Sequence, residues 1–151
     1  MNVPQADHIA VVDRERATVT ETWPLRQAKA NFPLILDEAN HRLFAGCRKP
    51  PKLLVFDTSV SGGRQVTSIA ISSDTDDLFL DARNKQIYVS CGQGVIDVIK
   101  QTSADTYEKV KTIGTAAGAR TSLFVPELKL FCLAVPHRGS QAAEIRVFKT
   151  E

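Results

Sequence analysis

Three acidic side chains lie within five residues, Asp74, Asp76 and Asp77, in the stretch SDTDD (73–77). Carboxylate oxygens are the ligands that a hard cation such as Ca²⁺ takes in proteins. The stretch has neither the central glycine nor the distal glutamate of an EF-hand loop, so it does not match that type of calcium site.

Arginine supplies a second candidate chemistry, at Arg48, Arg120 and Arg138. A planar guanidinium can hold a carboxylate or a phosphate through two parallel hydrogen bonds. Both sets of residues also have a purely structural interpretation, in which Asp74 and Asp76 cap turn amides and the arginines pair with them. The sequence leaves anion binding, metal binding and internal ion pairing open.

Patterns of nucleophilic or phosphate-cradling chemistry are not found. His137 has no second histidine or cysteine close in sequence, which favours a solvated loop histidine over a general base or metal ligand. The segment GSQ (139–141) does not match a GxSxG nucleophile elbow, and no helix follows GQG (92–94). We therefore predict no catalytic residue, no metal and no cofactor.

The chain contains three cysteines but no CxxC pair and no Cys/His cluster. Cys47 and Cys91 occupy the same place in two similar stretches, so we expect small buried side chains at strand ends. An odd number of cysteines gives no disulfide framework.

The chain contains an internal sequence repeat, and the strands of this repeat hold the side chains described above in place. Apolar strands that end in a charged residue recur with starts 44, 43 and 49 residues apart: IAVVD (9–13), LLVFD (53–57), IDVIK (96–100) and IRVFK (145–149). A second series recurs every 44 residues: LFAGC (43–47), IYVSC (87–91) and FCLAV (131–135). The shared spacing indicates one structural unit, repeated.

Each unit reads as four short strands separated by turn residues, at 32–37, 43–47, 53–57 and 65–71 in the second unit. A four-stranded antiparallel unit of this period is typical of a β-propeller blade. One such sheet cannot cover its own faces, whereas similar sheets arranged around an axis bury them against one another. We predict an all-β propeller fragment with about two complete blades between two partial ones.

The stretch IYVSCGQGVIDVIK (87–100) resembles the YVTN-type propeller repeat, with good matches at Tyr88, Val89, Gly92 and 97–99. The match is moderate over 43–57 and degenerate over 131–148. The resemblance implies a seven-bladed ring in complete members, export to the periplasm or cell surface, and a role in binding.

The blades are expected at 1–30 (partial), 31–73, 74–116 and 117–151 (partial, without an outer strand). A last blade without its outer strand suggests the C-terminal half of a longer propeller. A self-associating half-ring is the alternative. Open end blades would expose large apolar patches, so we expect the chain to pair with itself or with a missing half.

Loops that join the second strand to the third, and one blade to the next, gather on one face of a propeller and commonly carry its binding residues. Mapped onto this chain, they bring together nine candidates: Lys29, Asn31, Arg48, Asp74, Asp76, Asp77, Arg120, His137 and Arg138. The aromatic residues, including Phe32, fall on predicted strands and are expected to pack between blades.

Composition narrows the partner classes. A net charge of +2 and a charged fraction of 24% give no reason to expect nucleic acid, and no apolar run is long enough to span a bilayer. The first residues lack the basic and apolar regions of a signal peptide. We therefore predict a non-catalytic module that binds a protein, a peptide or a small anion. The alternatives are a lactonase-like or oxidoreductase propeller fragment, whose channel metal would fall to Asn31, Asp76 and Asp77, and a self-assembling half-propeller.

Overall fold

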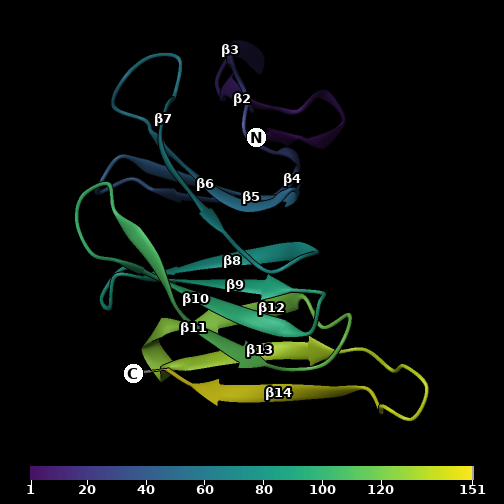
Figure 1. The fold of residues 1–151 in the computed structure, drawn as a ribbon. Helices are drawn as coiled ribbons and strands as arrows, with labels where there is room; N and C mark the ends of the chain where they lie inside the picture. The colour runs from purple at the N-terminus through teal and green to yellow at the C-terminus, as the bar shows by residue number, and fades with distance from the viewer. Residues whose placement is uncertain (151) are drawn as a thin grey trace.

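Fourteen β-strands in four antiparallel sheets make up the computed structural model, which describes residues 1–150 (Figure 1). The first and fourth sheets have three strands, and the second and third have four. Within each sheet the strands lie side by side in chain order, as in a meander. The prediction of an all-β chain with two complete four-stranded units between two partial ones is confirmed.

The strand bounds follow the repeat. The first two sheets contain β1 (Asn2–Val3), β2 (His8–Asp13) and β3 (Thr18–Pro24), then β4 (Lys29–Asp37), β5 (Arg42–Lys49), β6 (Pro51–Asp57) and β7 (Arg64–Ala70). The last two contain β8 (Thr75–Asp81), β9 (Gln86–Cys91), β10 (Val95–Gln101) and β11 (Tyr107–Gly114), then β12 (Thr121–Val125), β13 (Leu130–Val135) and β14 (Glu144–Lys149). Two single-turn 3₁₀ helices, Pro4–Ala6 and Pro126–Leu128, complete the described elements. Across residues 1–150, no helix has the length and apolar character that crossing a membrane requires.

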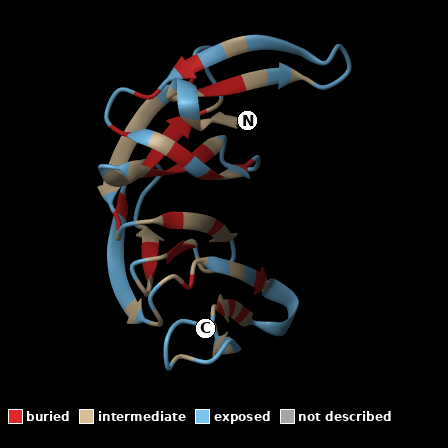
Figure 2. Ribbon diagram, turned by 90° about the vertical axis from the view of Figure 1, so that its right-hand side faces the viewer, coloured by how far each residue is buried: buried red, intermediate tan, exposed pale blue. Residues whose placement is uncertain are grey.

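The core lies between successive sheets, which follow one another along an open arc (Figure 2). Three apolar clusters fill the three junctions, and each is closed by aromatic contacts between neighbouring sheets. Phe44 of β5 meets Tyr107 of β11 edge-on, with ring centroids 5.5 Å apart. Phe79 of β8 meets Phe131 of β13 in the same way at 5.8 Å. Because both faces of β5, β6, β9 and β10 meet another sheet, these strands are almost wholly buried.

A buried carboxylate fastens the connection between the second and third sheets. Asp97 of β10 is fully buried and accepts hydrogen bonds from the Ser72 backbone N–H at 2.6 Å and the Thr112 hydroxyl at 2.7 Å. The Lys109 ammonium lies 3.5 Å from the same carboxylate. Asp97, the aspartate of the repeat segment 95–100, therefore joins the second sheet to the third.

The fourth sheet has one uncovered apolar face. Leu123, Cys132 and Val147 lie side by side in register across β12, β13 and β14. Leu123 and Val147 are each 56% exposed, and Ile145 is 64% exposed. The repeat counterparts of Ile145 and Val147 in the second sheet, Leu53 and Val55, are completely buried against the third sheet. The fourth sheet therefore presents a blade-packing face with nothing on it in the described chain.

Cys47 and Cys91 are buried, as the repeat predicted; Cys91 ends β9, and Cys47 lies two residues before the end of β5. Burial raises the pKa of each thiol to about 12, with smaller contributions from the Asp7 charge at Cys47 and the Asp97 charge at Cys91. An unfolded cysteine titrates near pH 8.5. Between these values the unfolded chain binds fewer protons than the folded chain, so stability must fall as pH rises.

We therefore expect the urea midpoint of the protein to drop between pH 8 and pH 10.5. The double variant Cys47→Ala/Cys91→Ala should be less stable at pH 8 because of lost packing, but its midpoint should depend less on pH. Ser103→Ala, which removes no titrating group, serves as the control. Equal pH slopes in the double variant and the wild type would show that the buried thiols do not produce the effect.

Candidate functional site

Charged side chains from three consecutive sheets meet at the end where the chain passes into the inner strands β8 and β12. Arg48 lies at the end of β5, Asp74 and Asp76 flank the start of β8, and Arg120 precedes β12. Together with Phe32 of β4 they form what we call the mouth cluster. Four of these five residues, all but Phe32, were candidates from the sequence.

Ion pairs hold the mouth cluster together. Arg48 Nη2 lies 2.6 Å from Asp76 Oδ1, and Arg48 Nη1 lies 3.4 Å from Asp74 Oδ1. Arg120 pairs with both carboxylates as well, through Nη1 to Asp74 and through Nε to Asp76 at 3.3 Å. Its hydrogen bond with Asp74 raises the pKa of Arg120. Two arginines and two aspartates thus share their charges, as in the internal-pairing interpretation of the sequence.

The backbone around Asp74 is specialised for this arrangement. Asp74 itself has φ +60°, in the left-handed region, and its carbonyl accepts a 2.8 Å hydrogen bond from the Gly92 N–H. A Cβ atom at residue 92 would lie 2.0 Å from Asp74 Oδ2. Glycine in the β9–β10 turn is therefore required for the carboxylate to occupy its place.

Phe32 extends the mouth cluster with an aromatic surface. The Arg48 guanidinium carbon lies 3.9 Å from the centre of the Phe32 ring, a cation–π contact. The Phe32 residue is 43% exposed. The expectation that Phe32 packs between blades is therefore wrong, because the residue is partly exposed beside Arg48 and belongs to none of the three apolar clusters.

Asp77 is bonded to the fourth sheet and has no ion pair with Arg48 or Arg120. It accepts a 2.6 Å hydrogen bond from the backbone N–H of Ser122 in β12. Burial raises the pKa of Asp77, and the neighbouring charge of Asp76 adds to the rise. This carboxylate links the third sheet to the fourth.

Asn31 and Lys29 belong to the junction between the first two sheets. The Asn31 amide is fully buried and donates to Asn2 Oδ1 at 2.7 Å and to the His8 carbonyl at 3.1 Å. Lys29 Nζ lies 3.5 Å from Asp7 Oδ2. The polar contacts of Asn31 and Asp77 are therefore made with different neighbouring sheets.

Arg138 and His137 lie in the long loop between β13 and β14. Arg138 and Gln141 exchange backbone hydrogen bonds of 3.0 and 2.9 Å, which close the loop. The Arg138 guanidinium covers Gly118, where a Cβ atom would lie 2.4 Å from its Cζ. His137 is exposed. Across residues 1–150, no three histidine, cysteine or acidic side chains gather in a way that could hold a metal ion.

The sequence did not indicate Phe32, Gly92 or Ser122 as parts of these contacts. The repeat spacing does indicate where the neighbouring residues lie. Asn31, Thr75 and Ala119 are 44 residues apart, and all three are fully buried. They mark the equivalent positions where the chain passes into β4, β8 and β12. The side chains next to them are those placed at the same end of the sheets.

Comparison with known proteins shows which fold the chain has. No family model and no curated protein matches the sequence. The solved hydrazine synthase of Kuenenia stuttgartiensis has a TM-score of 0.82 and 19% identity, over 97% of this chain and 41% of that one. A chain of a mitotic checkpoint complex gives 0.72 and 14%, over 85% and 40%. A candidate 6-phosphogluconolactonase of Bacteroides uniformis gives 0.73 and 15%, over 96% and 48%.

The chain has a β-propeller fold. At these identities the similarity concerns the fold and not the activity. The chain spans less than half the length of each of these three propeller chains.

Proposed function

We propose that this chain is a YVTN-type propeller module, built of blades at 1–30, 31–73, 74–116 and 117–151, that binds a protein or peptide at the mouth cluster. One observation carries the proposal: five side chains from three consecutive sheets form a partly exposed surface that is already ordered by its own ion pairs. Groups held in place before binding lose less conformational entropy when a partner arrives.

The charge balance favours a polypeptide over a small anion. Arg48 and Arg120 are each paired with both Asp74 and Asp76, so the four groups are formally neutral. A free phosphate or carboxylate would have to displace an aspartate that is already bound. A polypeptide can instead offer a cation to the aspartates, an acceptor to the arginines and an apolar side chain to Phe32. Aromatic residues and arginine are also enriched in protein interfaces.

The fold alone does not choose between recognition and catalysis. Among the similar structures, one belongs to a mitotic checkpoint complex and another to a candidate 6-phosphogluconolactonase. A lactonase-like or oxidoreductase role would need Asn31, Asp76 and Asp77 to converge. Asn31 is bonded to the first sheet, Asp76 to the arginines and Asp77 to β12, so no observation favours that alternative.

The proposal is tested by selecting a random peptide library on phage against the whole chain. We expect selected peptides to lose at least about tenfold in affinity for Arg120→Ala and Phe32→Ala, because both contribute to a central hot spot. Arg83→Ala, in the turn at the opposite end of β8, is the matched control and should bind as wild type. Peptides that bind all variants equally would contradict binding at the mouth cluster. Saturable binding of inorganic phosphate that is lost only in Arg120→Ala would show that the ligand is an anion and not a polypeptide.

A further inference from the structure

Arg138 presents a guanidinium that has no acidic partner in the described chain. It lies in the loop between β13 and β14, which projects beyond the end of the sheets where β9 and β13 end (Figure 1). The residue is exposed and forms no ion pair within residues 1–150, whereas Arg48 and Arg120 each pair with two aspartates. The acidic residue nearest to it in the sequence, Glu144, pairs instead with Arg146 Nε at 2.8 Å.

The backbone of Gly118 supports the Arg138 side chain. A Cβ atom at residue 118 would overlap the guanidinium, at 2.5 Å from Nη2, so the side chain rests directly on the glycine. Gly118 has φ +82°, a conformation that residues with a Cβ rarely adopt. Two backbone hydrogen bonds between Arg138 and Gln141 close the loop. The guanidinium is therefore held in one place while it stays accessible to a partner.

Backbone contacts join this guanidinium to the mouth cluster. The Gly118 N–H donates to the Gly92 carbonyl at 2.7 Å, and the Gly92 N–H donates to the Asp74 carbonyl at 2.8 Å. The Asp74 carboxylate also contacts Gly92, since it occupies the space that a Cβ atom there would need. Arg138 thus lies beside the Asp74 side of the mouth cluster, and two glycines separate the two residues.

Two cations beside the mouth cluster are not neutralised. The arginines and aspartates of the cluster balance one another. Lys49 follows Arg48 at the end of β5, is exposed and forms no ion pair within residues 1–150. Together with Arg138 it gives this part of the surface an excess of positive charge. Because complementary charge attracts a partner and like charge repels it, this surface favours an acidic segment of polypeptide.

We propose that the polypeptide bound at the mouth cluster carries an aspartate or glutamate whose carboxylate pairs with Arg138. This inference rests on the proposed function and adds the charge of the partner to it. A guanidinium can hold a carboxylate through two parallel hydrogen bonds, and one that is already held in place loses less conformational entropy on pairing. Lys49 is a point charge on a flexible stem, so Arg138 is the residue that fixes the position of the acidic side chain.

Parallel selections of a random peptide library on phage test the inference, with the whole chain as the target. Peptides selected on the wild type should share an aspartate or glutamate at one position, and peptides selected on Arg138→Glu should carry lysine or arginine there. A synthetic copy of the most enriched wild-type peptide should bind Arg138→Glu at least about tenfold more weakly, because two like charges then meet. Lysine in place of the acidic residue of that peptide should restore its binding to Arg138→Glu.

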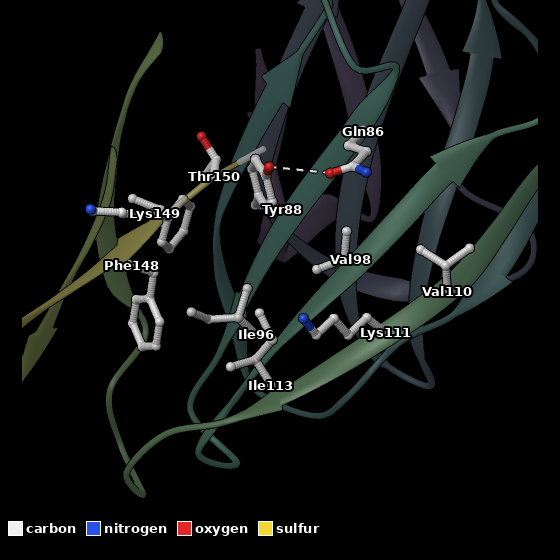
Figure 3. A pocket seen from close by; sticks show the side chains of 11 residues that line it. Gln86, Tyr88, Ile96, Val98, Val110, Lys111, Ile113, Phe148, Lys149 and Thr150 are labelled. Atoms are coloured by element: carbon white, nitrogen blue, oxygen red, sulfur yellow. Dashed lines mark hydrogen bonds between the residues drawn. The ribbon is translucent and has the colours of Figure 1, made fainter. Parts of the chain in front are cut away.

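Lys111→Glu is the matched control, because it reverses one charge at a different place. Lys111 and Lys149 line a pocket of about 270 Å³ between the third and fourth sheets, which shares no residue with the mouth cluster (Figure 3). The wild-type peptide should bind this variant as tightly as the wild type. A loss as large as that of Arg138→Glu would show that net charge attracts the peptide, and the specific pair would be overturned.

The remaining outcomes separate this inference from the proposed function. Peptides that lose affinity for Arg120→Ala and Phe32→Ala but bind Arg138→Glu normally would overturn the acidic pair and leave the mouth cluster as the binding site. Peptides that are insensitive to all three substitutions would overturn both. Circular dichroism checks that Arg138→Glu is folded. A loss in this variant that lysine in the peptide does not restore would also count against the pair.

Discussion

Replacing Leu53 by alanine should lower the free energy of unfolding by about 3 kcal/mol, whereas the same truncation at Ile145 should lower it by about 1 kcal/mol at most. The two residues occupy equivalent positions in β6 and β14, but Leu53 is completely buried between two sheets and Ile145 is 64% exposed. The first substitution removes packed methyl groups and leaves a cavity. The second removes a side chain that solvent already surrounds.

Urea unfolding of the whole chain measures both values, and it should be run at two protein concentrations that differ by about a hundredfold. A concentration-independent difference between the variants is the expected result. If Ile145→Ala proved as damaging as Leu53→Ala, the open face of the fourth sheet would have to be covered in solution. A loss that grows with concentration would identify the cover as another copy of the chain.

Removal of the Asp97 carboxylate should be the most damaging change among the polar residues. In Asp97→Ala the Ser72 N–H and the Thr112 hydroxyl lose their acceptor, and the nearby Lys109 loses its counter-ion. A buried group left without its partner typically lowers stability by about 3 kcal/mol. Asp97→Asn keeps an acceptor for Ser72 and should lose roughly half as much.

Asp13→Ala provides the matched comparison, since Asp13 accepts amide hydrogen bonds from Glu15 and Arg16 in an exposed turn. Asp13→Ala should lower the free energy of unfolding by less than about 1 kcal/mol, because water can replace the carboxylate as acceptor. Chemical denaturation at pH 7 provides the measurement. Comparable losses at Asp97 and Asp13 would show that the inter-sheet connection is not held by this carboxylate.

Much of the fold could be predicted because its determinants are local and repeated. Alternating apolar residues in stretches such as 53–57 and 87–91 indicate strands, and their 44-residue spacing indicates sheets of one kind. The presence of an incomplete sheet at each end also followed from the repeat. Asp13 and Asp57, which end two equivalent strands of the repeat, accept hydrogen bonds from the backbone N–H groups of Glu15 and Ser59.

The candidate site was predictable as a set of residues but not as a set of contacts. Arg48 and Arg120 come from different sheets, and each meets Asp74 and Asp76 only because three consecutive sheets are packed at fixed angles. Phe32 was misjudged for a related reason. Alternation along a strand shows which residues share a face, but it does not show where that face is left uncovered.

The amino-acid order by itself determined the repeated four-stranded unit, the turns and the arginines and aspartates available at one end of the sheets, since each depends on neighbours a few residues away. Only the tertiary structure decided that these charges neutralise one another and that, within residues 1–150, nothing covers the face around Val147. These features depend on how separate sheets pack against one another. Such contacts join residues that are far apart in the sequence, so the spacing of the repeat does not predict them.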